Sequence, residues 1–388
     1  MRGPHSVLLV ACALFGACTN FDREDRIEDL RVLAVRTEPA EILYNPLYAF
    51  TRPDERPPGL ELPGVDMQVE VFAVEPRGGL VRSEVRLCPD GNFACVDFDP
   101  SHLFADLGGE PRIDLEEAYL PRAAETDVDL ERDPAGQLPG LRFDWRFTEA
   151  VIDSIVPRTA GGDPIPSFFP ELPRFAIDLE SKAHAEVTRE TAFKRVPVGV
   201  DLWDPSLPPE FRDTLSVALG IQLCDERVPD EEYVEGRTDC VEPRGPNQNP
   251  ALIGFDVLAP DEEPEDGVRT AETSDLGLSS VLSVPRGGVV SLMPVFAPGT
   301  LERYQVLSFD IEASTLTIEN RREDLALSWY TTRGDAFGET SLQFGGHFGV
   351  DWSLPFSGIE PGERDVLVLV ARDQRGGTAV ARVTVEYR

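Results

Sequence analysis

Four cysteines in the body of the chain are spaced as two local pairs, and such pairs form disulfides in an oxidising compartment. Cys88 and Cys95 lie seven positions apart, and Cys224 and Cys240 lie sixteen apart. Four cysteines allow three pairings, of which the local one, Cys88–Cys95 with Cys224–Cys240, closes the shortest loops. Neither pair has the CxxC spacing typical of zinc sites, so we expect disulfides and no metal at these sulfurs.

Acidic residues around the first cysteine pair are the best candidates for binding a hard cation, because calcium takes several carboxylate and carbonyl oxygens. The candidates are Asp90, Asn92, Asp97 and Asp99. Their spacing is not that of an EF-hand. We therefore expect a solvated acidic loop and no cofactor, with bound calcium as the alternative.

No residues in the sequence have the spacing of a catalytic or phosphate-binding motif. HExxH, GxSxG, P-loop and GxGxxG patterns are all absent from the sequence. Beyond the N-terminal segment the histidines are isolated in sequence: His102, His184 and His347. We predict no catalytic residue, and we expect that the protein is not an enzyme.

The first seventeen residues have the form of a secretory signal peptide. Arg2 supplies the positive charge, residues 7–15 are apolar, and small residues precede Cys18. Leu14-Phe15-Gly16-Ala17-Cys18 resembles the lipobox of bacterial lipoproteins. The resemblance implies that Cys18 is lipidated and begins the mature chain, followed by a tether over residues 18–28. The alternative is ordinary cleavage near Ala17 with an unmodified cysteine.

The residue after the lipidated cysteine and the overall charge both bear on where the protein acts. Thr19, rather than Asp, follows Cys18, which by the sorting rule of enteric bacteria implies the outer membrane of a Gram-negative cell. The chain has 36 Lys+Arg against 70 Asp+Glu, a net charge of −34. That charge excludes nucleic acid as a partner and excludes electrostatic docking on anionic lipid, so the acyl chain must supply the membrane anchor.

The elements that would position these residues are mostly strands. In residues 29–252 we predict a β-rich, irregular sandwich-like domain with short helices. Apolar residues alternate with polar ones, the period of a strand, over 30–34, 65–73, 80–87, 141–147, 175–179, 191–200 and 215–223. Short helices are predicted over 114–123 and from Thr148 through Ile155.

A compositional break divides the chain. Residues 253–275 include an acidic cluster and are predicted to be a linker. From residue 276 to the end, short apolar runs follow one another over 281–284, 289–296, 307–311, 316–318, 325–329, 366–371 and 379–387. The segment 373–377 is predicted as a hairpin turn with glycine at the positive φ. This pattern predicts a C-terminal immunoglobulin-like β-sandwich, so the whole chain is expected to be mainly β.

Several segments resemble a known group of proteins. Residues 325–330, 332–334, 352–355 and 368–377 look like the last domain of a group of uncharacterised myxobacterial surface lipoproteins, and residues 31–39 and 192–198 resemble other parts of that group. Those last domains are similar to immunoglobulin-like and PKD-like sandwiches. The resemblance implies a disulfide-free variant with Trp329 as the core tryptophan. The group has no assigned activity to carry over.

Together these features predict an exported, lipid-anchored envelope protein with a structural or binding role, recognising a protein or a glycan. The alternative is an accessory secreted hydrolase or inhibitor whose active loops lie in residues 97–175. A third reading is a subunit of an envelope assembly.

Overall fold

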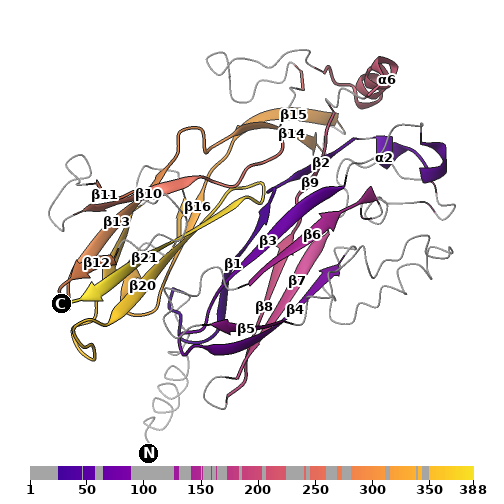
Figure 1. Cartoon of the computed structure of the whole chain (residues 1–388). Helices are drawn as coiled ribbons and strands as arrows, with labels where there is room; N and C mark the ends of the chain where they lie inside the picture. Colours follow the sequence, from indigo (N-terminus) through magenta and orange to yellow (C-terminus); the bar gives the residue numbers. More distant parts are fainter. Residues whose placement is uncertain are drawn as a thin grey trace, which may run out of the picture.

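A computed structural model of the chain shows a mainly β protein (Figure 1). The structure describes residues 25–45, 47–56, 64–88, 126–130, 141–149, 151, 159, 163, 173–182, 186–202, 207–223, 240–241, 245–258, 269–272, 281–310, 315–337, 340–342 and 349–388. Within these ranges, no helix is both long enough and apolar enough to cross a membrane.

The N-terminal half is built from two antiparallel sheets, of order β1-β3-β6 and β5-β4-β7-β8. Their alternating strands bury one face each, so that Val71 and Ile177 share a core in which Trp145 meets Phe175 edge-on at 5.1 Å. The strands are β1 (Arg31–Glu38), β3 (Val65–Val74), β4 (Gly79–Cys88), β5 (Thr126–Leu130), β6 (Leu141–Phe147), β7 (Arg174–Ser181) and β8 (Thr188–Arg195).

Short elements complete this half. A parallel ladder joins β2 (Ile42–Tyr44) to β9 (Val198–Val200), and a single turn of helix, α2 (Leu47–Phe50), precedes a 3-10 turn at Pro53–Glu55. The strands β1 and β8 are the end strands of their sheets, and they lie next to each other without pairing in the described ladders. We call the line along which these two sheet edges meet the seam between β1 and β8.

Two five-stranded sheets, β11-β10-β13-β19-β17 and β12-β21-β20-β16-β18, face one another in the C-terminal half. One core between them holds Trp329 and Trp352, which are 1% and 0% exposed, so the prediction of Trp329 as the core tryptophan is confirmed. The strands are β10 (Leu252–Leu258), β11 (Arg269–Glu272), β12 (Val281–Val284), β13 (Val289–Phe296), β16 (Ala326–Thr331), β17 (Asp335–Phe337), β18 (Thr340–Leu342), β19 (Val350–Ser353), β20 (Arg364–Arg372) and β21 (Thr378–Tyr387).

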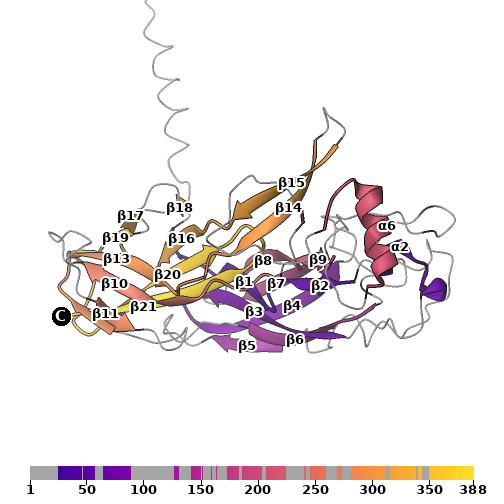
Figure 2. The same cartoon turned by 90° about the horizontal axis from the view of Figure 1, so that it is seen from above.

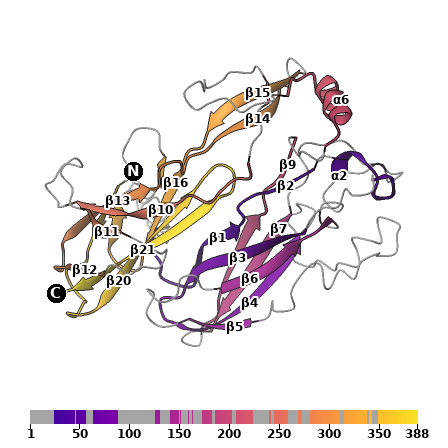
Figure 3. The same ribbon diagram turned by 45° about the horizontal axis from the view of Figure 1, so that its top comes forward.

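A separate hairpin projects from this half. Strands β14 (Arg303–Asp310) and β15 (Thr315–Arg322) pair with each other and reach toward the helix α6 (Pro209–Leu219), as Figure 3 shows. Ile318 on β15 packs in one small core with Leu215 of α6. The hairpin therefore links the C-terminal half to a helix that precedes it by about a hundred residues in the sequence.

The two halves share a core of their own. Val368 and Val370 on the outer face of β20 pack against Leu33 of β1 and Phe72 and Val74 of β3. Strand β20 is consequently buried on both faces from Asp365 to Ala371. Figure 2 shows the N-terminal sheets lying alongside β20 and β21.

Two predicted domain boundaries are wrong. Residues 253–258 were expected in an acidic linker but belong to β10, which pairs with β13 inside the C-terminal sheet. Residues 25–28 were expected in a free tether, yet Ile27 is 1% exposed and its N–H donates to the carbonyl of Thr331 at 2.9 Å. In both places the segment is held by backbone pairing with strands that are distant in the sequence.

The strand predicted over 215–223 is also wrong, because residues 209–219 form the helix α6. Pro209 occupies the first helical turn, and Gly220 ends the helix in the left-handed region at φ 64°. Leu215 is buried while Val217, two residues later, is 84% exposed. The alternation of apolar residues matched a strand by chance, whereas the flanking proline and glycine carried the helix signal.

Most other strand predictions are confirmed. The predicted bounds of β12 and β13 are those of the structure, and β3, β6, β20 and β21 differ from their predicted bounds by at most two residues at either end. Residues 191–200, predicted as one strand, form β8 and β9 with Val196 and Pro197 between them. Glu149 and Val151 are helical, as predicted for the segment beginning at Thr148, while the helix predicted over 114–123 lies outside the described residues.

Candidate functional site

The predicted disulfide cysteines are only partly described. Cys88 ends β4, while its predicted partner Cys95 is outside the described ranges. Cys240 is disulfide-bonded. A β-bridge between Leu223 and Val241 brings the backbone beside Cys240 next to the residue that precedes Cys224. Cys224 itself is not described, so the pairing Cys224–Cys240, like Cys88–Cys95, stays a prediction.

The other predicted site residues lie outside the described parts of the chain. This holds for the lipidation site Cys18, for the calcium candidates Asp90, Asn92, Asp97 and Asp99, and for the histidines His102, His184 and His347. It also holds for most of residues 97–175, where the alternative function placed its active loops. Among the residues that are described, no group of three or more His, Cys, Asp or Glu side chains could hold a metal ion.

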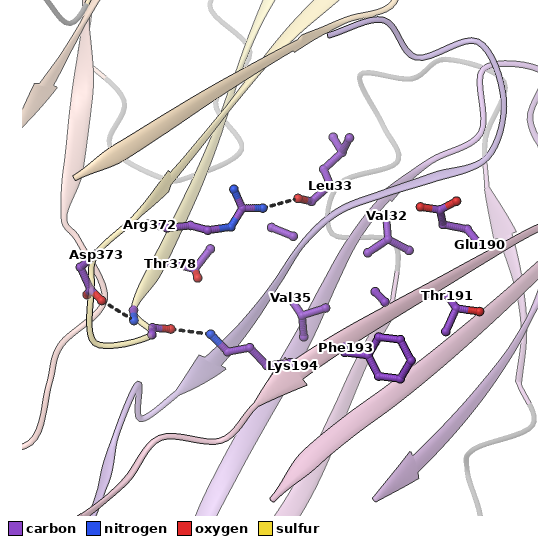
Figure 4. Close-up of a pocket in the computed structure, with 14 residues that line it drawn as sticks. Val32, Leu33, Val35, Glu190, Thr191, Phe193, Lys194, Arg372, Asp373 and Thr378 are labelled. Atoms are coloured by element: carbon purple, nitrogen blue, oxygen red, sulfur yellow. Dashed lines mark hydrogen bonds between the residues drawn. The ribbon is translucent and has the colours of Figure 1, made fainter. Parts of the chain in front are cut away.

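A cavity of about 430 Å³ lies where the seam between β1 and β8 meets the turn that joins β20 to β21 (Figure 4). Its walls are formed by residues of β1, by residues on both faces of β8, and by the turn from Arg372 to Thr378. The cavity exists because the two sheet edges do not pair and the turn covers one end of the gap between them.

The turn is held rigidly by Asp373. Its carboxylate accepts the backbone N–H groups of Arg375 and Gly377, each at 2.8 Å, and the side-chain amide of Asn247 at 3.0 Å. Gly376 has φ 100°, a conformation that side chains disfavour, and a Cβ at Gly377 would overlap the Asp373 carboxylate. Two adjacent glycines are therefore required for this wall of the cavity.

Two cations line the cavity from opposite halves of the molecule. Lys194 of β8 donates from Nζ to the carbonyl of Gly376, and Arg372 donates to the carbonyl of Leu33 at 2.7 Å (Figure 4). Burial lowers the pKa of Lys194 to about 8, with attraction to Asp373 opposing the effect and repulsion from Arg372 adding to it. Phe193 precedes Lys194 in β8, and its side chain is therefore on the opposite face of the strand, where it is 54% exposed.

One carboxylate lines the far end of the cavity. Glu190 accepts a hydrogen bond from the backbone of Val32, and burial raises the pKa of Glu190 while Arg31 opposes the increase. The cavity thus contains donors and an acceptor, which is the arrangement of a polar ligand site. The geometry shows no nucleophile beside a general base within these walls.

Behind the turn, Arg375 forms a buried charge network. Its guanidinium contacts Glu41 at 2.8 Å, Glu302 at 3.0 Å and Glu323 at 3.2 Å, and it lies 5.0 Å over the ring of Tyr304. Burial raises the pKa of Glu323 to about 7. Because Glu41 belongs to the N-terminal half and the other partners to the C-terminal half, Arg375 fastens the halves together beside the cavity.

Sequence reasoning did not find this site. Residues 192–198 were noted only for a resemblance, and residues 373–377 only as a turn, so neither pointed to a cavity. One signal was available: Lys194 is one of only two lysines in the chain, and it lies in a strand that otherwise alternates regularly. No pattern in the sequence places that strand against a turn almost two hundred residues away.

Comparisons with known proteins identify no family. No family model and no curated protein matches the chain. Three solved structures show a faint likeness: a nucleoside hydrolase-related hypothetical protein from Saccharophagus degradans (16% identity, TM-score 0.19), a Ca2+-stabilised ice-binding adhesin of an Antarctic bacterium (10%, 0.18) and a 1.5-MDa bacterial ice-binding adhesin (8%, 0.17).

The matches cover 37%, 93% and 93% of this chain, which in turn spans 26%, 50% and 65% of those chains. At such TM-scores the likeness carries no weight for function.

Proposed function

We propose that the protein is an exported, lipid-anchored component of a Gram-negative outer membrane that binds a glycan in the cavity between its two halves. The observation that carries the binding role is the cavity itself, about 430 Å³ in volume and lined by β1, β8 and the β20–β21 turn. Small-ligand sites have volumes of this order and lie preferentially between domains, whereas protein partners need broad flat surfaces.

The rigidity of the junction supports this proposal. The shared core beneath β20 and the Arg375 network fix the halves relative to each other, so both walls of the cavity are in place before a ligand arrives. Preorganised walls raise affinity because little conformational entropy is lost on binding.

Lipidation at Cys18 would hold this body close to the membrane. The segment from Asp25 to Ile27 is fastened to Thr331 of β16, which leaves only the residues between Cys18 and Asp25 as a tether. Seven residue steps reach at most about 25 Å when fully extended. In this proposal the protein is a membrane-proximal binding module.

A glycan array tests the binding role with a matched pair of variants. Glu190→Trp places a large ring at the cavity wall, while Arg189→Trp places the same ring one residue earlier, on the opposite and exposed face of β8, outside the cavity. We expect wild type and Arg189→Trp to retain the same envelope polysaccharides or peptidoglycan fragments, and Glu190→Trp to lose them. Equal retention by both variants, or retention of no glycan by wild type, contradicts the proposal.

The anchor is tested separately by metabolic labelling with a radioactive fatty acid. Label is expected on the wild-type chain and absent from Cys18→Ala. Absence of label from wild type, or equal label on both, removes the lipid anchor from the proposal and leaves the cavity untouched.

A further inference from the structure

The two cations of the cavity stand out because they lack an acidic partner. In a chain with 70 Asp+Glu against 36 Lys+Arg, several partly buried arginines of the described residues pair with carboxylates, among them Arg36 with Glu70 and Arg77 with Glu75. Lys194 and Arg372, by contrast, are bonded to neutral oxygens, and within the described residues neither has a carboxylate within 4.0 Å.

Their hydrogen-bonding capacity is also largely unused. An ammonium has three donors, and Lys194 gives one of them to the carbonyl of Gly376. A guanidinium has five, and Arg372 gives one to the carbonyl of Leu33 at 2.7 Å and a long one, 3.4 Å, to the hydroxyl of Ser328. Both groups keep N–H donors for a ligand.

The acids that line the same cavity do not neutralise these donors by contact. The carboxylate of Asp373 is bonded to two backbone amides and to Asn247, and that of Glu190 to the backbone of Val32. Each acid is therefore held by the protein's own N–H groups, whereas the two cations face the cavity (Figure 4).

Beyond the proposed glycan-binding role, on which this inference rests, the structure assigns the ligand a chemical class. We propose that the cavity binds an anionic sugar, with Lys194 and Arg372 binding its oxyanion. The oxyanion is a carboxylate or a phosphate ester, since both accept charge-assisted hydrogen bonds from ammonium and guanidinium groups.

The state of Lys194 agrees with such a role. Burial and the nearby Arg372 lower its pKa to about 8, against the opposing attraction of Asp373. A bound anion favours the charged ammonium, so binding raises this pKa, and the affinity falls as the pH rises above about 8.

The experiment uses the full chain labelled with [ε-13C]lysine, which gives only two side-chain signals because Lys182 and Lys194 are the only lysines. Glucuronate and glucose 6-phosphate are the anionic probes, and glucose is the neutral one. We expect at least one anionic probe to shift the Lys194 signal and raise the pKa that it reports. The signal of Lys182, an exposed residue outside the cavity, should not move.

Variants identify the groups that act. Lys194→Gln should weaken binding of the anionic probe about 10-fold or more, as expected for one lost charge-assisted hydrogen bond, while Lys182→Gln leaves affinity unchanged. Binding of glucose as tightly as both anionic probes overturns the inference but leaves the proposed glycan site standing. If neither anionic probe moves the Lys194 signal the inference also fails, and the glycan array then decides separately whether the binding role survives.

Discussion

Arg375 gives the sharpest test of how the two halves are held together. Its guanidinium faces three carboxylates, of which those of Glu41 and Glu323 are 7% and 1% exposed, so Arg375→Gln leaves buried negative charges without their counter-charge. Removing one partner of a buried ion pair costs about 3–5 kcal/mol. Since whole domains are stable by only about 5–15 kcal/mol, we expect a large fall in the free energy of unfolding at pH 8.

The loss should depend on pH in a defined direction. Burial raises the pKa of Glu323 from 4.5 to about 7, so the folded state holds this proton more tightly than the unfolded chain does. The stability that this group contributes is therefore greatest at low pH and is lost as the pH rises from about 4.5 to 7. At pH 5 Glu323 is protonated with or without Arg375, so the penalty of Arg375→Gln should be smaller than at pH 8, with Glu41 and Glu302 as the carboxylates that still lose their counter-charge.

Urea unfolding at pH 5 and pH 8, followed by circular dichroism, measures both quantities. The control is Arg364→Gln, which breaks a 3.1 Å pair with Glu386 whose side chains are 47% and 41% exposed; we expect a loss of about 0–1 kcal/mol at either pH. A loss from Arg375→Gln below about 1 kcal/mol at pH 8, or one as large at pH 5 as at pH 8, refutes the reasoning.

Three further predictions concern the turn, the N-terminal segment and the helix. Gly377→Ala should destabilise the fold by about 1–3 kcal/mol, because the added Cβ overlaps the Asp373 carboxylate. Gly362→Ala, at φ 86° and with no atom near its Cβ, should cost about 1 kcal/mol, and thermal melting of the two variants measures the difference. Ile27→Ala should cost about 2–5 kcal/mol and speed proteolytic cleavage near the N-terminus, because that side chain is buried between the halves. Leu215→Ala should lower the free energy of unfolding by about 2 kcal/mol or more, whereas Val217→Ala should change it by no more than about 0.5 kcal/mol, as measured by urea unfolding. In a strand these two residues would share a face, and the two substitutions would then have similar effects.

The strands of the C-terminal half could be predicted from sequence because each has its own local signal. In β21, Val383, Val385 and Tyr387 alternate with Arg382 and Glu386, and that period of two needs no tertiary context. The mainly β fold class followed from the sum of such segments and is confirmed.

The same alternation of apolar and polar residues is a poor guide where another element covers the second face of a strand, or where the segment is a helix. Val380 and Thr384 lie on the face of β21 opposite Val383 and Val385, yet they are 3% and 1% exposed, and Val380 packs in the core that the two halves share. In α6 the apolar alternation around Leu215 outweighed the helix-starting Pro209 and the helix-ending Gly220, which were the better guides. The period of the apolar residues shows which faces of a helix or strand are apolar, but it does not show which other element covers those faces.

The candidate site was beyond sequence reasoning for a different reason. It is formed by β8, the bulged strand β1 and the turn after Arg372, three segments that are distant in sequence and individually unremarkable. Contacts between the two halves bring these segments together. One of them is the hydrogen bond from Arg372 to the carbonyl of Leu33, two residues that are 339 positions apart in the sequence. Long-range contacts of this kind leave no local pattern.

The strong acidity of the chain makes the composition of this cavity meaningful. With acids outnumbering bases roughly two to one, a partly buried cation would ordinarily find a carboxylate, and Arg375, one turn away from Arg372, finds three. Lys194 and Arg372 are kept from such partners because the nearby Asp373 is bonded to the turn's own backbone. The turn therefore has two roles. Arg375 neutralises carboxylates from both halves, whereas Asp373 accepts hydrogen bonds from the backbone of the turn, so that Lys194 and Arg372 remain available to bind an anion.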